Sequence, residues 1–146
     1  MKVTHIEHIG IAVRDLDSAI ALYEKVYGLR CYAVEEVADQ QVRTAFFMVG
    51  GTKIELLAAT SPGGPVGRFI EKKGEGVHHI AFAVQDLDAA LAEAKAKGIH
   101  LIDRRPRRGA EGLAIAFLHP AATGGVLTEL CQKPENQSEP TTPEHM

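Results

Sequence analysis

The stretch HIGIAVRDLDSAIA at residues 8–21 returns as HIAFAVQDLDAALA at residues 79–92. Nine of these fourteen positions are identical, and the two stretches are 71 residues apart. Repetition over such a distance indicates that one structural unit has been duplicated. We therefore predict two copies of one module, at residues 3–58 and 77–132, joined by a linker at residues 59–76.

The repeated stretch predicts a strand followed by a helix in each copy. The apolar runs Ile9–Val13 and Ile80–Val84 are short enough to favour buried strands over helices. Asp15 and Asp86 follow these runs, and their carboxylates can accept hydrogen bonds from the free N–H groups at a helix N-terminus. The two helices are expected over Leu16–Val26 and Leu87–Lys97, with Gly28 and Gly98 at their C-terminal ends.

Three further strands are predicted in each copy, separated by turns that contain glycine or proline. They are expected over Leu29–Val37, Val42–Val49 and Lys53–Ala58 in copy one, and over Ile99–Asp103, Ala114–Leu118 and Val126–Cys131 in copy two. Each copy is then a βαβββ module whose sheet has one uncovered face. Pairing of the modules would bury those faces and enclose a cleft between the sheets. The predicted fold class is α+β, with two paired βαβββ modules in one domain over residues 1–132.

The segments outside the two copies differ from them in composition. The linker contains SPGGP, which is typical of a loop, followed by a short predicted helix over Val66–Lys73. Residues 133–146, KPENQSEPTTPEHM, are polar and rich in proline. We predict that this C-terminal segment is a disordered tail.

The overall composition favours a small-molecule partner. A chain of 146 residues with 45% hydrophobic residues can bury a core, and its net charge of -3 leaves no surplus of positive charge for nucleic acid or an anionic membrane. No stretch approaches the roughly 18 apolar residues of a membrane span, and MKVTHIEHIGIAV lacks the pattern of a secretory signal. We expect a cytoplasmic protein with no nucleic-acid or membrane partner.

Each copy also carries one histidine and one glutamate at matching places. His8 and His79 begin the first strand of their copies, whereas Glu55 and Glu129 lie in the last strands, in TKIELL and VLTELC. A pseudo-two-fold arrangement of the copies would bring all four residues toward a common axis. Two imidazole nitrogens and two carboxylate oxygens suit one divalent ion of Mn, Fe, Co, Ni or Zn, with open positions left for substrate oxygens.

A structural role is the alternative for each of these residues taken singly. A lone histidine beside an apolar strand is commonly a hydrogen-bonded structural residue, and a lone glutamate in a strand is commonly solvated. Recurrence of both residue types at matching positions favours the metal site. Glu55 and Glu129 also lie inside apolar segments, where an unpaired carboxylate would cost several kcal/mol that a bound ion would offset.

Three segments carry a resemblance to a known family: HIGIAVRDLDSAIALYEKVYGL at 8–29, SPGGPVGRFIEKKGEGVHHIAFAV at 61–84 and FLHPAATGGVLTEL at 117–130. At these residues the chain resembles the vicinal-oxygen-chelate superfamily, whose members pair βαβββ modules around a metal ion held by His and Glu. The second and third segments are similar, more specifically, to the methylmalonyl-CoA epimerase family. The resemblance covers most of the chain, from the first strand to the last predicted one.

The resemblance implies an enzyme that interconverts the C2 epimers of methylmalonyl-CoA by removing and returning a proton. It further implies an acyl-CoA substrate, a homodimer and one divalent ion, with cobalt favoured. The implied metal ligands are His8, Glu55, His79 and Glu129. Glu55 and Glu129 are also the expected proton-transfer groups, with Glu129 favoured. Some members of the family carry a glutamate where this chain has Thr44 and a glutamine at the Glu55 position, so Glu55 is expected to serve as ligand, base or both.

Other residues around the predicted metal site are candidates for binding the substrate. The backbone N–H groups of Gly109 and Gly112 could bind a substrate carboxylate, although a plain tight turn explains GAEGL equally well. The basic stretches with Arg68, Lys72 and Lys73 and with Arg104, Arg105, Arg107 and Arg108 could meet CoA phosphates or be solvated surface. Because side chains alternate along a strand, His78 should point away from His79 and is excluded as a ligand.

Three other functions remain open from the sequence. Glyoxalase I would use the same four ligands on a thiol adduct of an oxoaldehyde. A ring-cleaving Fe(II) dioxygenase normally uses two histidines and one carboxylate, which would leave Glu55 without a role. A binding protein on the same scaffold that sequesters a small molecule would need no complete ligand set.

Overall fold

The computed structural model describes residues 1–133, so the predicted disordered tail lies outside the described residues except for Lys133. Copy one consists of β1 (Val3–Ala12), α1 (Leu16–Tyr27), β2 (Cys31–Val37), β3 (Val42–Val49) and β4 (Thr52–Ala59). The linker contains α2 (Pro65–Lys73). Copy two consists of β5 (Gly76–Val84), α3 (Leu87–Ala96), β6 (Arg107–Arg108), β7 (Ala114–Leu118) and β8 (Thr128–Gln132). Over residues 1–133, no helix has both the length and the apolar character needed to cross a bilayer.

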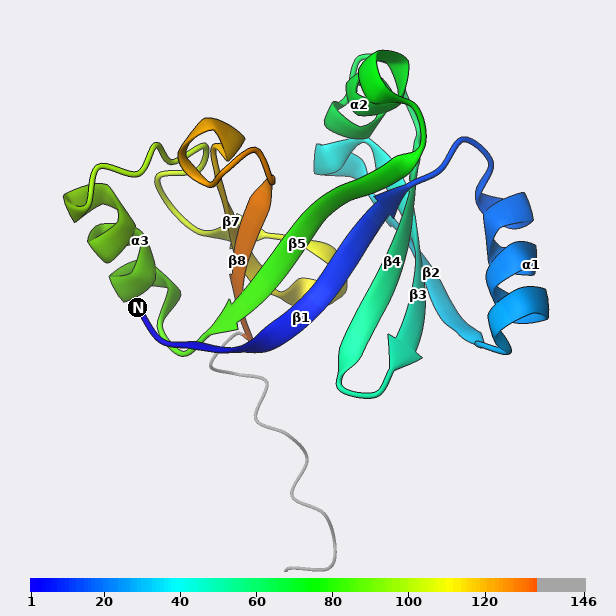
Figure 1. Ribbon diagram of the computed structural model, residues 1–146, viewed down its shortest axis with the longest axis horizontal. Coiled ribbons are helices and arrows are strands. Elements are labelled where there is room, and N and C mark those ends of the chain that lie inside the picture. Colours follow the sequence, from blue (N-terminus) through cyan, green and yellow to red (C-terminus); the bar gives the residue numbers. More distant parts are fainter. Residues whose placement is uncertain (134–146) are drawn as a thin grey trace, which may run out of the picture.

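All eight strands belong to one sheet in the order β2-β3-β4-β1-β5-β8-β7-β6. The first strands of the two copies, β1 and β5, pair antiparallel at its centre, and each pairs in parallel with the last strand of its own copy. Figure 1 shows β1 and β5 side by side in the middle, with α1 and α3 at opposite ends of the molecule and α2 near the ends of β5 and β4. The α+β fold with two paired βαβββ modules is confirmed.

The modules pair in a different way from the one predicted. We expected a cleft enclosed between two separate sheets, whereas the copies join edge to edge through β1 and β5 into one sheet. The reason is that β1 and β5 each have one edge left without a partner inside their own copy, and unpaired backbone N–H and C=O groups are costly to bury. Pairing the two edges satisfies both strands and makes a single curled sheet whose inner face receives side chains from both copies.

The predicted helix starts are confirmed. The Asp15 carboxylate accepts a hydrogen bond from the backbone N–H of Ser18, and Asp86 accepts one from Ala89, each at 3.0 Å. Gly28, with φ of 67°, ends α1 in the left-handed conformation that glycine adopts without strain. Helices α1 and α3 cover the outer face of the sheet, where two hydrophobic clusters lie: Val13, Leu16, Ala45, Phe47 and Leu56 under α1, and Val84, Leu87, Leu91, Ala116 and Leu130 under α3.

The strand predicted over Ile99–Asp103 is wrong. This segment makes only a single bridge, between Leu101 and Leu118. Asp103 uses its side chain in place of a strand ladder, because its carboxylate accepts a hydrogen bond at 2.9 Å from the backbone N–H of Phe117. The chain then bends at Arg104 and Arg105, Pro106 has no N–H to donate, and the edge strand β6 contains only two residues.

Candidate metal centre

All four predicted ligands lie on the central strands β1 and β5 or on their neighbours β4 and β8: they are His8, Glu55, His79 and Glu129. Gly10 of β1 lies opposite Glu55 on one side and opposite His79 on the other. Ala81 of β5 lies opposite His8 and opposite Glu129 in the same way. The same arrangement of positions therefore occurs twice, related by a pseudo-two-fold axis between β1 and β5.

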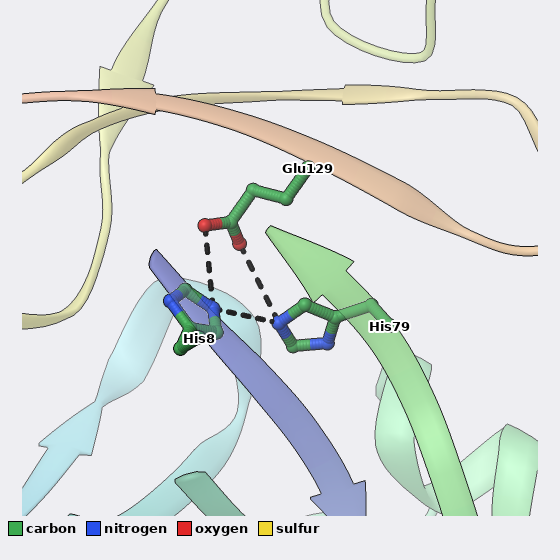
Figure 2. Close-up of side chains that lie close together, drawn as sticks. All are labelled: His8, His79 and Glu129. Atoms are coloured by element: carbon green, nitrogen blue, oxygen red, sulfur yellow. Dashed lines mark hydrogen bonds and ion pairs between the residues drawn. The ribbon is translucent and has the colours of Figure 1, made fainter. Parts of the chain in front are cut away.

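Three of these side chains converge. The Nε2 atoms of His8 and His79 lie 3.0 Å apart, and the planes of the two rings are at 88°. The carboxylate of Glu129 lies close to both nitrogens, with Oε2 3.4 Å from Nε2 of His8 and Oε1 3.6 Å from Nε2 of His79. Figure 2 shows the two rings and the carboxylate pointing toward one another from three strands.

A divalent ion fits this cluster chemically. His8, His79 and Glu129 are at most 5% exposed, and within residues 1–133 the buried Oε2 of Glu129 has no hydrogen-bond partner. A buried carboxylate oxygen without a partner carries a desolvation cost that a cation offsets. Imidazole nitrogens and carboxylate oxygens are common ligands of first-row divalent ions. These three residues are therefore a candidate ligand set.

Glu55 lies on the other side of the His8 ring. Its Oε2 is 3.0 Å from Nδ1 of His8, and the side chain is buried. The possible ligand atom of Glu55 groups with those of Glu7 and His8, not with those of His79 and Glu129. The structure thus brings three of the four predicted ligands together at the Nε2 atoms and sets the fourth against the opposite nitrogen of His8.

Burial and neighbouring charges shift the pKa values of these groups. Burial alone would lower the pKa of His8, but its hydrogen bond to Glu7 and the charges of nearby glutamates raise it to about 9. Burial raises the pKa of Glu55 to about 8 and that of Glu129 to about 7. Burial is the main cause that holds the pKa of His79 well below its usual value, and the charge on His8 lowers it further. Two carboxyl groups with pKa values near neutrality are suited to proton transfer.

Two further residues contact the Nδ1 atoms of the ligand histidines: Glu7, which the sequence did not identify, and His78, which was excluded as a ligand. The carboxylate of Glu7 accepts a hydrogen bond from Nδ1 of His8, and Nδ1 of His78 lies 2.9 Å from Nδ1 of His79. The prediction that His78 points away from His79 is therefore wrong.

Bulges in the central strand pair explain both contacts. The β1–β5 register shifts at Glu7, where β1 has one residue more than β5, and again at His78, where β5 has the extra residue. A bulge breaks the alternation of side chains and can turn the extra residue toward the site. The only trace of this in the sequence is that a hydrogen-bonding residue precedes the ligand histidine in both copies, and that alone does not reveal a bulge.

Lys53 links the site to the outer edges of the sheet. Its ammonium group donates to Glu7 and, at 2.9 Å, to Oε1 of Glu111. The Tyr32 hydroxyl donates to Glu111 at 3.3 Å, and the backbone N–H of Glu111 donates to Glu35 at 3.0 Å. Tyr32 and Glu35 belong to β2, whereas Glu111 follows β6. These contacts therefore hold the two edges of the curled sheet together beside the site.

Two adjoining spaces lie around the cluster. A cavity of about 20 Å³, lined by the four predicted ligands, has room for about one water molecule or ion. A pocket of about 220 Å³ shares Gln40, Leu57 and His79 with this cavity. The larger pocket is mostly apolar and also contains Arg68 and Arg107. A small molecule in it would reach the cluster from the side of His79.

The GAEGL segment forms a wall of the small cavity. Gly109 donates its backbone N–H to the carbonyl oxygen of Leu113 at 2.8 Å, so this donor is used within the turn. Ala110 and Leu113 line the cavity. Gly112 has φ of 73° and ends the turn Ala110–Gly112. Substrate binding by the backbone of Gly109 and Gly112 stays a prediction.

Similarity to known proteins extends over nearly the whole chain. Residues 7–117 match the family model of the Glyoxalase/Bleomycin resistance protein/Dioxygenase superfamily. The chain is 44% identical over 135 residues to the uncharacterized protein YqjC of Bacillus subtilis, which covers 92% of this chain and 96% of that protein. It is 36% identical over 128 residues to the mitochondrial methylmalonyl-CoA epimerase of Homo sapiens, covering 87% of this chain and 73% of that protein.

Solved structures give the same result. A Streptomyces coelicolor methylmalonyl-CoA epimerase in complex with 2-nitronate-propionyl-CoA matches with a TM-score of 0.88 and 40% sequence identity, covering 92% of this chain and 97% of that chain. The match includes the strands that carry the cluster, since it spans nearly all of both chains. The protein therefore belongs to the Glyoxalase/Bleomycin resistance protein/Dioxygenase superfamily and, within it, to the methylmalonyl-CoA epimerase family.

Proposed function

We propose that this protein is a metal-dependent epimerase that interconverts (2R)- and (2S)-methylmalonyl-CoA. The observation that carries the proposal is the buried cluster of His8, His79 and Glu129, with the second carboxylate, Glu55, at the opposite nitrogen of His8. This cluster provides a cation site and two groups able to exchange protons, which are the two requirements of the reaction.

The chemistry explains both requirements. The thioester makes the C2 proton of methylmalonyl-CoA more acidic. The negative charge of the adjacent carboxylate opposes removal of that proton, because the product carries a second negative charge. A divalent ion held by His8, His79 and Glu129 would supply positive charge beside the carbonyl oxygen where negative charge develops. Because the cluster is almost fully buried, water screens that charge weakly.

Inversion at C2 requires proton transfer on both faces, and the two glutamates supply one group for each. Glu55 is the candidate base, because its carboxylate contacts Nδ1 of His8 rather than the converging Nε2 atoms and so can be free of the ion. Glu129 lies in the symmetry-related place in the other copy and would return the proton on the opposite face. Each proton-transfer group contributes on the order of 10² to 10⁴ in rate.

Glu55 takes on this role because Thr44 cannot. Thr44 is 1% exposed and lines the same small cavity as Glu55, but a hydroxyl group is not a base at neutral pH. The pKa of Glu55, raised to about 8 by burial, lies close to the value that suits a general base near neutral pH.

The pocket of about 220 Å³ is the candidate site for the acyl end of the substrate, since it leads to His79 through apolar walls. Arg68 and Arg107, which also line it, are candidates for charge-assisted hydrogen bonds to an anionic group of the substrate. Cobalt as the ion and a homodimer stay predictions that the family resemblance implies, and a cytoplasmic location stays a prediction from the sequence.

The activity is tested by giving the cobalt-loaded protein pure (2S)-methylmalonyl-CoA and separately methylglyoxal with glutathione. We expect the first substrate to reach a mixture of epimers, and the adduct that forms spontaneously from methylglyoxal and glutathione not to be converted. Consumption of the methylglyoxal adduct without epimerisation would instead assign glyoxalase I activity. Binding of methylmalonyl-CoA without either reaction would leave a non-catalytic binding protein.

A further inference from the structure

We infer that Glu7 and His78 are positioning residues, one in each copy, which hold the imidazoles of His8 and His79 with Nε2 toward the ion. The inference rests on the metal site of the proposed function and adds two residues to it. Its basis is a symmetry of contacts: the residue before each ligand histidine is turned inward by a bulge and touches Nδ1 of that histidine.

In copy one, the contact is made by a carboxylate that is itself held in place. Glu7 is only 9% exposed and accepts hydrogen bonds from Nδ1 of His8 and from the ammonium group of Lys53. Turning away from His8 would leave a buried charge less well paired, which is costly. Glu7 therefore favours the form of His8 in which Nδ1 carries the proton, and this leaves Nε2 as the atom available to an ion.

In copy two, the same place is filled by an imidazole. The ring of His78 packs edge to face on Phe69 of α2, with ring centroids 5.0 Å apart, and its Nδ1 faces Nδ1 of His79 at 2.9 Å. Of two facing nitrogens, one must donate and the other accept. If His79 donates from Nδ1, its Nε2 carries a free electron pair directed at the ion. A neutral imidazole has one acceptor nitrogen, so the ring of His78 can accept this hydrogen bond.

The linker helix gains a role from this arrangement. Phe69 lies on α2, outside both repeats, and its ring packs against the ring of His78, which in turn contacts His79. An imidazole ligand generally needs a partner on its second nitrogen to fix its orientation, and removing such a partner typically weakens metal binding 10- to 100-fold. His8 and His79 both have such a partner, a carboxylate for His8 and an imidazole for His79.

The test compares the Co²⁺ affinity of five full-length proteins, measured by competition with a chromophoric chelator. They are the wild type, Glu7→Leu, Glu7→Gln, His78→Phe and the control Glu36→Gln, which changes an exposed residue of β2. Phe keeps the ring that packs on Phe69 but removes the acceptor nitrogen. The free energy of unfolding of each metal-free protein is measured by urea denaturation, so that loss of metal binding is separated from loss of folding.

We expect Glu7→Leu and His78→Phe each to bind Co²⁺ roughly 10- to 100-fold more weakly than the wild type. Glu7→Gln should lose less than Glu7→Leu, because its amide oxygen can still accept the Nδ1 proton, and the control should bind as the wild type does. If Glu7→Leu does not fold, Glu7→Gln and His78→Phe decide the outcome.

Wild-type affinity in folded His78→Phe and in folded Glu7→Leu, or in Glu7→Gln where the Leu variant does not fold, would overturn the inference. An effect in one copy alone would overturn the symmetric assignment. Failure of the wild type to bind Co²⁺ would overturn the metal site and this inference together. A wild type that binds Co²⁺ but does not epimerise would contradict the proposed activity alone, because affinity is measured without substrate.

Discussion

A Cβ atom at Gly10 would lie 2.5 Å from Nδ1 of the His79 ring and closer still to its Cε1. The lack of a side chain at Gly10 therefore gives the imidazole of His79 its place across the β1–β5 pair. The symmetry-related position holds Ala81, so the second copy accommodates a methyl group where the first does not. The two halves of the metal centre therefore share the same strand positions but differ in how the side chains pack across the β1–β5 pair.

Gly10→Ala should displace the ring of His79 and weaken Co²⁺ binding by about tenfold or more, as expected when a ligand loses its orientation. The change should leave the sheet intact, because alanine fits the extended conformation of a strand. The matched control is Ala81→Gly, which should lower stability by about 0.5–1 kcal/mol through backbone entropy but keep the metal affinity. Equal Co²⁺ affinity of Gly10→Ala and the wild type would show that the ring of His79 can bind the ion without the space at Gly10.

The sequence predicted those parts of the fold that depend on local chemistry and on the repeat. Asp15 and Asp86 indicated the helix starts, because a carboxylate at that position accepts a hydrogen bond from a free N–H group of the first turn. The apolar runs marked the central strands. The strand expected over Ile99–Asp103 failed because the side chain of Asp103 replaced a ladder hydrogen bond, and no periodicity reveals such a substitution.

Parts of the site that depend on strand pairing could not be predicted. Period-two alternation places His78 away from His79 and gives Glu7 no role, yet the shifts of register between β1 and β5 turn both residues inward. The repeat predicted that four ligands would gather but not that Glu55 would lie at Nδ1 of His8, away from the Nε2 atoms. The inward turn of Glu7 and His78 depends on the bulges, which involve both strands at once.

Substitution of the two glutamates should separate holding the ion from moving the proton. Glu129→Gln should reduce both Co²⁺ affinity and C2 proton exchange, because both oxygens of Glu129 lie near the Nε2 atoms. Glu55→Gln should reduce exchange by about 10² to 10⁴ while changing Co²⁺ affinity much less. Isothermal titration and deuterium exchange measure the two effects. A Glu55→Gln protein that exchanges normally would remove Glu55 from the role of base.

Metal affinity should rise with pH between about 6 and 9. Protons compete with the ion for the same atoms, and the raised pKa values of about 7 for Glu129 and about 9 for His8 keep these groups largely protonated at low pH. As the pH rises through each of these pKa values, fewer protons must leave the ligands when the ion binds, so the metal affinity increases. Calorimetric titrations in buffers of different ionisation enthalpy should detect protons released at pH 7. An affinity that does not change across this range would contradict the prediction.

Lys53→Met should lower the free energy of unfolding by about 2 kcal/mol, since it removes charged hydrogen bonds to Glu7 and Glu111 and leaves two carboxylates without their cation. Urea denaturation measures the loss. The matched control is Lys97→Met, which removes an exposed pair with Glu93 on α3 and should change stability by less than about 0.5 kcal/mol. Equal effects of the two changes would show that the Lys53 contacts do not hold the sheet edges together.

Deuterium incorporation at C2 of methylmalonyl-CoA in deuterium oxide, starting from each pure epimer, tests the proposed metal-dependent epimerisation. The cobalt-loaded protein should introduce deuterium at C2 and bring both epimers to the same mixture, and removal of the ion by a chelator should abolish both effects until Co²⁺ is restored. Full occupancy by Co²⁺ with no deuterium at C2 from either epimer would contradict the proposed function.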